Sequence, residues 1–252
     1  MSRKTRLILF IISAAGLLAV MFLGLGGLPG FGRYPGPYGD LISARVVQER
    51  HVTNAPTAIN FDYRGLDTLG EEFILFASVA AILLLLRTDR EVSDSRPEPR
   101  AADRPTLQVD DALSWFGFHI AWVTGIFGVY VILHGQLTPG GGFHGGVIIG
   151  SAALLLFLTN GARAFHTAHS KEQLDGLDAI GAGAYALIGI AIALTGAPFL
   201  KNILPLGKVG ELTSGGTIPL INFGVGVEVF AAFALLFSEF IKEMRNPEGD
   251  LK

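Results

Sequence analysis

Six long apolar runs constrain what this chain can fold into. The hydrocarbon core of a bilayer needs about 20 apolar residues per helix, and most of the runs reach or approach that length. Within lipid every backbone N–H and C=O must be satisfied internally, which leaves helices or a closed barrel. Barrel strands alternate in hydrophobicity over about 10 residues, and these runs do not alternate. We therefore predict an all-α, polytopic membrane protein with about six transmembrane helices, over residues 7–28, 69–87, 113–134, 145–160, 177–197 and 217–241.

Composition supports this class and argues against several others. Charged residues make up 16% of the 252 residues, whereas a soluble domain carries about 25%. The net charge of −3 gives no indication of nucleic-acid binding. The chain has no cysteine, which excludes disulfides, thiolate metal sites and iron–sulfur ligation. No nucleophile–base set or cofactor motif stands out, so we expect no enzyme activity, no cofactor and no bound metal.

The N-terminal run could be a signal peptide, because Arg3, Lys4 and Arg6 precede it. Its 22 residues exceed the usual apolar region of such a peptide, and no A-x-A-like cleavage site follows, so we expect a retained first helix. Lys and Arg counts give the orientation, since these residues accumulate in cytoplasmic loops. With the N-terminus inside, 13 of the 19 Lys and Arg residues lie on the inner side. We therefore predict that both termini are inside (N-in/C-in).

Two hydrophilic stretches divide the chain. Residues 88–106 contain three prolines and mixed charge, which is typical of a flexible linker. Residues 29–69 open with a run of proline and glycine that favours turns, so we expect a loop there. The linker separates a two-helix N-terminal part, 1–87, from a four-helix part, 107–252.

Small residues mark one face of the third apolar segment. Gly117, Ala121 and Gly125 recur at i, i+4 and i+8, a spacing that lets two helices approach closely. His119 lies about 200° around the helix from Gly117, so a second face carries an imidazole that should not meet lipid. Both faces need protein cover, which indicates more helices around this segment than a lone monomer provides.

Glycine supplies six of the twelve residues from Gly135 to Gly146, where the third apolar segment gives way to the fourth. A tight turn is the simplest interpretation, with Pro139 ending one helix and the glycines allowing positive φ. A phosphate-binding loop is excluded, because no Lys-Ser/Thr pair follows the last glycine. Backbone at membrane depth is the third interpretation, since a 145–160 helix would span only about 24 Å of a core of about 30 Å. The residues concerned are Pro139, Gly140, Gly141, Gly142, Phe143, Gly145 and Gly146.

Glu228 is the most informative single residue. It lies about midway along the 217–241 segment, near the expected centre of the bilayer. A carboxylate there costs about 2.5–3.5 kcal/mol on insertion scales, so such a residue is a functional candidate that faces the bundle or a partner protein. The alternative is a structural acid, protonated or hydrogen-bonded to a neighbour. Gly224 and Gly226 just before it would allow a backbone, an ion or water to come close.

Acidic residues also stand at the start of the second apolar segment. Thr68-Leu-Gly-Glu71 matches a capping box, in which Thr68 and Glu71 satisfy the first N–H groups of a helix. The alternative is an acidic mouth, formed by Glu71 with Asp67 or Glu72, that attracts Na+ through hard oxygen ligands. The residues alone do not decide between these two interpretations.

Other ionisable residues have simpler interpretations. His119 could relay protons because imidazole titrates near physiological pH, yet a histidine hydrogen-bonded between helices is the commoner arrangement. His134 and His144 flank the glycine string without a local carboxylate, so no metal site is expected there. Asp175 and Asp178 lie at the expected start of the fifth helix, where an N-cap or helix-dipole role suffices.

The glycine string resembles the MnhB/MrpB family, whose members belong to the multisubunit Mrp-type Na+/H+ antiporter. The match comprises His134-Gly135 and the segment from Pro139 to Gly146. A later element of the family is also present, from Gly216 to Glu228, with Asn222 where some members carry Asp. The front part, Asn60 to Glu71, resembles the small module of membrane-bound hydrogenases and the corresponding C-terminal module of the large Mrp A protein.

This resemblance implies a non-catalytic subunit of a large antiporter complex in the cell membrane. Its partners would be the A, C, D, E, F and G type subunits, and Na+ and H+ would be the transported ions. It would serve assembly through the glycine string and contribute to the ion path, with Glu228, Glu71, Asp67, Glu72 and His119 as candidates. No lysine lies inside an apolar run, which independently disfavours a proton-pumping core. A hydrogenase or respiratory component, and a pure scaffold without ion contact, are the open alternatives.

Overall fold

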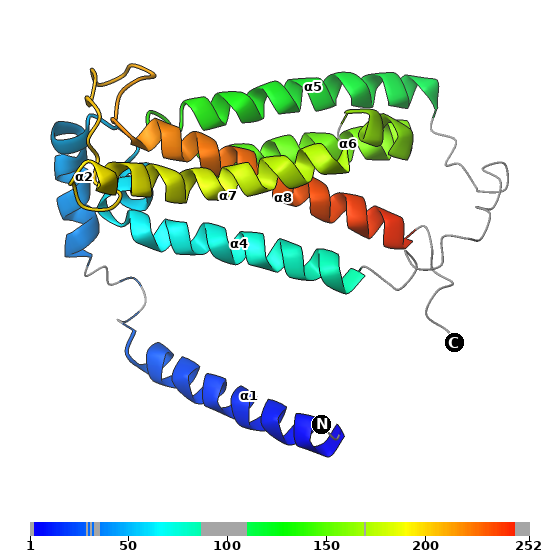
Figure 1. Ribbon diagram of the computed structural model, residues 1–252, viewed down its shortest axis with the longest axis horizontal. Helices are drawn as coiled ribbons and strands as arrows, with labels where there is room; N and C mark the ends of the chain where they lie inside the picture. The colour runs from blue at the N-terminus through cyan, green and yellow to red at the C-terminus, as the bar shows by residue number, and fades with distance from the viewer. Residues whose placement is uncertain are drawn as a thin grey trace. The chain divides into compact units, whose positions relative to one another are not determined.

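The regular structure of the chain is helical throughout the part that the computed structural model describes, residues 3–28, 30, 32, 36–86, 110–168 and 170–244 (Figure 1). Six helices are long and apolar enough to cross a membrane, which confirms the predicted class and number of spans. The chain forms two compact units, Met1–Ile42 and Ser43–Lys252. The predicted linker, 88–106, lies outside the described residues, so the division there stays a prediction.

The first unit holds α1, Arg3–Gly26, and the beginning of α2, Pro37–Arg50. In α1 the residues Lys4–Gly26 form a membrane-length apolar helix. The second unit holds the rest of α2, a short helix, one turn of π-helix and a bundle of five long helices. These elements are α3 Ala55–Ala58, η1 Ile59–Tyr63, α4 Gly65–Leu86, α5 Asp111–Leu133, α6 Gly142–Ala168, α7 Lys171–Leu194 and α8 Ile218–Met244.

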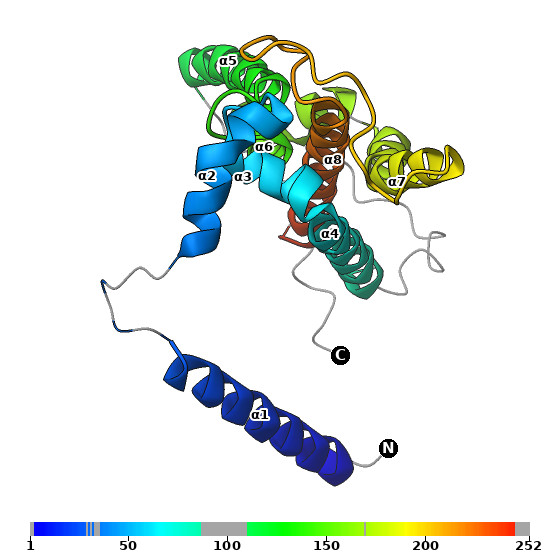
Figure 2. The same ribbon diagram turned by 90° about the vertical axis from the view of Figure 1, so that its left-hand side faces the viewer.

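α8 is the central helix of the second unit. It packs against α4, α5, α6 and α7, and the view from one end shows it between α4, α6 and α7 (Figure 2). Of its most apolar 18 residues 61% are buried, against 17–33% for the other membrane-length helices of this unit. A helix covered on so many sides needs small or apolar residues all round. Residues 224–234 supply them, with Glu228 as the one ionisable exception.

The glycine string continues into α6 and lets that helix pack closely on α8. Gly142, Gly146 and Gly150 recur every four residues and share the face that contacts α8. A Cβ on Gly146 would lie 2.8 Å from the carbonyl oxygen of Gly226, and one on Gly150 would lie 2.9 Å from the Cβ of Phe233. The string is therefore a helix–helix interface of the small-residue type as well as a turn.

α5 packs on a second face of α6 through Gly117, Ala121 and Gly128. A Cβ on Gly128 would lie 2.9 Å from the carbonyl oxygen of Gly145, so the two backbones are in contact. The predicted small-residue face is wrong at Gly125, where nothing lies within 4 Å of an added Cβ. Each four-residue step advances about 40° beyond a full turn. Two such steps carry Gly125 off the contact face, whereas Gly128 returns to it.

α4 and α7 begin earlier in the sequence than their apolar runs indicated. α4 begins at Gly65, which places Thr68 inside the helix and buried, so the predicted capping box of Thr68 and Glu71 is wrong. α7 is capped by Ser170, whose side chain accepts a hydrogen bond from the N–H of Gln173. Hydropathy alone misses these polar first turns, because residues at a helix start are suited to capping and to the helix dipole.

The fourth span is longer than expected. α6 begins at Gly142, and its membrane-length part continues to Gly161, where the backbone leaves the helical conformation with φ 80°. These 20 residues cover about 30 Å. The prediction of a short helix over 145–160 is therefore wrong, and with it the reason for placing the glycine string at membrane depth. α5 ends at Leu133, which places Pro139 in the turn between α5 and α6 and not at the helix end.

Residues 43–63 and 195–217 form a polar cap over the end of the bundle where α8 begins (Figure 1). The loop expected at 29–69 is wrong in part, because it contains α2, α3 and η1. The Asn54 side chain donates to the carbonyl oxygens of Gly135 and Thr138 at 2.7 and 2.8 Å, and its backbone N–H donates to that of Gln136. These bonds tie the α5–α6 turn to the cap.

A matched pair of glycines on α5 tests this packing. Gly128→Val should lower the free energy of unfolding by about 1–3 kcal/mol, the usual cost of overpacking, because its side chain would meet the α6 backbone. Gly125→Val should leave it nearly unchanged, since the space beside it is open. Unfolding of the purified protein in mild detergent measures both. Equal destabilisation by the two variants would contradict the α5–α6 contact.

Candidate functional site

Glu228 lies at the centre of the bundle. It is ten residues into the 24-residue span Ile218–Ile241, and its side chain is fully buried. Within the described part of the chain neither carboxyl oxygen has a hydrogen-bond partner. An ionised carboxylate left unpaired in an apolar interior is strongly destabilised. The group therefore needs a proton or a cation to be stable in this position.

Two further carboxyl groups approach Glu228 from other helices. Glu72 comes from α4 and Asp178 from α7, and both side chains are buried. Both of them act electrostatically on Glu228, and Glu72 has the larger influence. Glu72 Oε2 and Asp178 Oδ1 also lack hydrogen-bond partners among the residues described. We call Glu72, Glu228 and Asp178 the buried carboxyl set.

A close crossing of α7 and α8 holds Asp178 beside this set. Gly181 lies three residues after Asp178, and a Cβ on it would stand 2.5 Å from the backbone nitrogen of Glu228. On α8, a Cβ on Gly224 would lie 3.5 Å from the Cβ of Ala184. Because glycine has no side chain, the two helices meet closely, and the Asp178 carboxyl is held within one helical turn of the contact.

Three carboxyl groups without a fixed counter-cation can hold protons or a mobile cation. Neighbouring carboxyl groups in a protein interior are not all ionised together unless a proton or a cation neutralises them. Carboxylate oxygens also suit hard cations such as Na+. In the described ranges no three His, Cys, Asp or Glu side chains are grouped so as to hold a metal ion.

The acids predicted to form a mouth lie on different sides of α4. Glu72 points into the bundle, whereas Asp67 and Glu71 are exposed. Asp67 also forms an ion pair with Arg64. Neighbouring residues on a helix are about 100° apart, so an adjacent glutamate pair points in two directions. The structure therefore joins Glu72 to the buried carboxyl set and leaves Glu71 outside it.

His119 lies on the exposed side of α5, away from the α6 contact. Its Nδ1 donates to the carbonyl oxygen of Trp115 at 2.8 Å, and its ring lies 4.1 Å from the indole ring of that residue. A carbonyl oxygen only accepts, so this bond fixes the proton on Nδ1. The hydrogen bond and ring contacts described for His119 all stay within its own helix.

Asn222 joins the glycine string to α8. Its Oδ1 accepts a hydrogen bond from the N–H of Gly142 at 2.6 Å, and its Nδ2 donates to the carbonyl oxygen of Ile132 at 2.6 Å. Gly140 and Gly141, with φ of 129° and 139°, take the backbone conformation that favours glycine. Side chains at 143 and 144 are exposed. The amide thus satisfies both a donor and an acceptor, which a carboxylate at the same position does not.

Asp178 is the site residue that sequence reasoning assigned to another role. An N-cap function is wrong, because α7 starts seven residues earlier, at Lys171, and Asp178 is buried in its third turn. Asp178, Gly181 and Tyr185 recur at i, i+3 and i+7 and are all buried. That spacing marks one face of a helix and could have identified Asp178 as inward-facing. Asp175, one turn earlier, is exposed.

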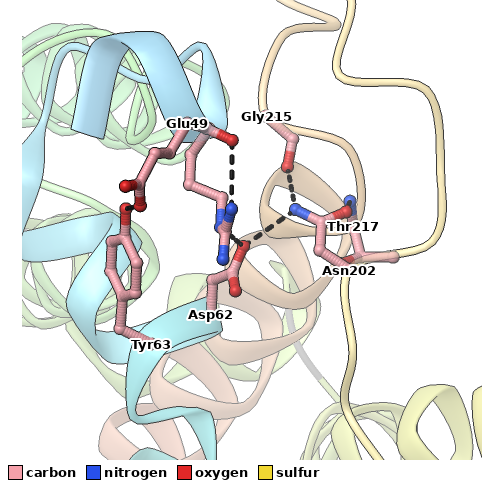
Figure 3. A network of polar contacts seen from close by, with 7 residues as sticks. Glu49, Asp62, Tyr63, Asn202, Gly215 and Thr217 are labelled. Atoms are coloured by element: carbon pink, nitrogen blue, oxygen red, sulfur yellow. Dashed lines mark hydrogen bonds and ion pairs between the residues drawn. The ribbon is translucent and has the colours of Figure 1, made fainter. Parts of the chain in front are cut away.

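A polar network outside the spans holds the cap together (Figure 3). Arg50 Nε pairs with Asp62 Oδ2 at 2.6 Å, and Asn202 Nδ2 donates to the same oxygen at 3.1 Å. The Tyr63 hydroxyl donates to the carboxylate of Glu49 at 2.7 Å. Burial, together with this hydrogen bond, raises the pKa of Tyr63 to about 12.

Asn202 extends the network to the start of α8. Its Nδ2 donates to the carbonyl oxygen of Gly215 at 2.8 Å, and its Oδ1 accepts from the N–H of Thr217 at 2.9 Å (Figure 3). Gly215 and Gly216 both have positive φ, at 95° and 65°. The network therefore connects η1 to the segment that leads into the helix carrying Glu228.

Comparison with known protein families gives a match within the bundle. Residues 114–235 match the model of a domain related to the MnhB subunit of the Na+/H+ antiporter. The chain is 29% identical over 199 residues to an uncharacterized protein of Methanocaldococcus jannaschii, covering 73% of this chain and 75% of the relative. It is 27% identical over 227 residues to a probable A/B-type component of a K+/H+ antiporter from Rhizobium meliloti, covering 82% of this chain but only 22% of that one.

Two solved structures share the fold. A chain of the membrane-bound sulfane sulfur reductase, an archaeal respiratory membrane complex, superposes with a TM-score of 0.67 at 27% identity, covering 95% of this chain and 98% of that chain. A chain of the Mrp complex from Dietzia sp. DQ12-45-1b superposes with a TM-score of 0.67 at 23% identity, covering 95% of this chain and 26% of that chain.

The spans and the buried acids define a multi-pass helical membrane protein with ionisable groups in its interior. Residues 114–235 of this bundle are similar to the MnhB-related domain of Na+/H+ antiporters. The resemblance of Asn60 to Glu71 to the Mrp A module stays a prediction.

Position 142 tests the glycine string. Gly142→Val should lower the free energy of unfolding by about 2 kcal/mol or prevent folding, because a Cβ there would contact the backbone oxygen of Asn222. His144→Ala should have little effect, since His144 is exposed. The yield and unfolding midpoint of the detergent-purified protein measure both, and equal tolerance of the two changes would contradict the interface.

Tyr63 tests the cap through its pH dependence. Because its pKa rises from 10.0 to about 12 on folding, its contribution to stability is present below pH 10 and lost as pH approaches 12. Tyr63→Phe should therefore flatten the fall in unfolding free energy over that range. Tyr38→Phe, at an exposed tyrosine, is the control. A wild-type slope in the Tyr63 variant would show that the Tyr63–Glu49 bond does not form.

Proposed function

We propose that this chain is an accessory membrane component of a multisubunit cation/proton antiporter, and that its buried carboxyl set contributes to the ion path. Support comes from the MnhB-related domain and from relatives that include an A/B-type antiporter component and a chain of an Mrp complex. Its partners are then the A, C, D, E, F and G type subunits, in the cell membrane, with both termini inside. The transported ions are H+ and Na+ or K+, and the role is transport, not catalysis.

The buried carboxyl set is the observation that carries this proposal. An acid near the centre of the bilayer costs a few kcal/mol even when it finds partners. A protein that only held its neighbours in place would be better served by apolar side chains of similar volume. Three such acids from three helices, with oxygens left unpaired, therefore favour a role in moving ions over a pure scaffold.

A respiratory membrane complex is the second candidate. The chain is nearly coextensive with its counterpart in the sulfane sulfur reductase complex, 98% of which it covers, whereas it covers 26% of the Mrp chain. Mild-detergent purification separates the two proposals through the chains that co-isolate. Antiporter-like chains without a redox module favour the first, and chains that carry iron–sulfur clusters or another redox centre favour the second.

Glu228→Gln tests the ion-path role. It keeps the size and polarity of the side chain but removes its ability to exchange a proton, so cation-driven proton movement should fall by about a hundredfold. Dye-reported pH changes in inverted membrane vesicles containing the whole complex measure this. Glu172→Gln, at an exposed position of α7, should match the wild type. If the Glu228→Gln complex assembles normally and its antiport is undiminished, the ion-path role is wrong and the scaffold role is favoured.

A further inference from the structure

Exposed carboxyl groups adjoin the buried carboxyl set on both sides. Asp175 lies one turn before Asp178 on α7, is exposed and interacts electrostatically with it. Glu71 is the exposed neighbour of Glu72 on α4 and interacts with it in the same way. Arranged by these pairwise interactions, the five acids follow the order Asp175, Asp178, Glu228, Glu72, Glu71.

The two ends of this series lie toward opposite ends of the bundle. α4 and α8 begin at the polar cap, whereas α7 ends there (Figure 1). The Tyr185 hydroxyl fixes this arrangement, because it donates to the carbonyl oxygen of Gly65 at 2.7 Å and so sets the later half of α7 beside the start of α4. Glu71, six residues into α4, lies toward the cap. Asp175, four residues into α7, lies toward the far end.

We propose that these five carboxyl groups form a proton relay that runs through this chain from the far end of the bundle to the outer side of α4 near the cap. The relay deepens the function proposed above and rests on it. Its order follows from helix direction and burial: the three middle members are enclosed, and the two end members are exposed on the surface of this chain. Glu228, with both oxygens unpaired, is the middle step.

Proton movement along the relay balances at every step. A proton binds the Asp175 carboxylate and passes to Asp178, and each carboxyl group returns to its former ionisation state when the proton moves on. Release from Glu71 completes the transfer and leaves all five groups as they began. No other reactant is required.

Charged groups near each end set the local field. At the Asp175 end, Lys171 and Glu239 lie 3.8 Å apart across α7 and α8. At the Glu71 end, the Arg64–Asp67 ion pair stands one turn earlier on α4, and Tyr185 from α7 interacts with Glu71. Each end therefore combines one open acid with a pair of charges that largely neutralise each other.

Asp175→Asn and Glu71→Gln test the relay, because both positions are exposed and the changes should not disturb folding. An exposed acid at the mouth of a proton path raises the local proton supply, so each variant should slow antiport by about tenfold at alkaline pH and much less at acidic pH. Asp175→Glu keeps a carboxyl group at this position and should retain the wild-type antiport rate. Glu172→Gln should also match the wild type. Initial rates over a range of pH, in vesicles containing the assembled complex, measure these effects.

A double substitution tests the serial order. When Glu228→Gln has already broken the relay, adding Asp175→Asn should slow antiport no further, whereas independent sites would give multiplied losses. In addition, Asp175→Asn should delay the rise of the protonated-carboxyl infrared band after a drop in pH. Two results would overturn the relay. One is a wild-type antiport rate at every pH in both Asp175→Asn and Glu71→Gln, and the other is a double variant whose loss of rate equals the product of the two single losses. If Glu228→Gln still slows antiport when either of these results is found, the relay is wrong but the proposed function of the chain stands.

Discussion

Contact between helix backbones, which glycine makes possible, is the interaction on which the rest of this structure depends. α8 is enclosed because α6 meets it through Gly142, Gly146 and Gly150, and because α7 meets it at Gly181. In lipid, apolar surface gains nothing by leaving apolar surroundings, so close packing and hydrogen bonds hold such helices together. That enclosure is what keeps Glu228 from the membrane, and without it the carboxyl would be exposed to hydrocarbon.

Much of the fold could be predicted from the sequence, because membrane spans depend on a long-range average of hydropathy. The six spans follow from that average. Glu228 stands out because it is a charged residue in the middle of the apolar run 217–241. Helix starts could not be placed as well, since the first turns of α4 and α7 are polar and look like loop. The same error hid Asp178, which seemed terminal only because α7 was expected to begin at residue 177.

The relation between helices was the part that sequence alone could not supply. Gly125 and Gly128 are the same residue type on the same helix, and only one touches α6. Glu71 and Glu72 are adjacent, and only one enters the interior. In both cases a rotation of the helix by less than half a turn decides the outcome. That rotation depends on which neighbour is present, so it becomes visible only when all five bundle helices are placed together.

Tyr185 gives α7 a fixed register against the cap. Its hydroxyl donates to the carbonyl oxygen of Gly65 at 2.7 Å and lies 3.3 Å from that of Asn60, in the π-helix turn. A sliding motion of α7 by a fraction of a turn would break this anchor and uncover a buried phenol. The bond therefore opposes movement of α7 along its own axis. Together with the Gly181 contact to α8, which lies between Tyr185 and Asp178 on the same helix, it gives α7 two fixed points against its neighbours.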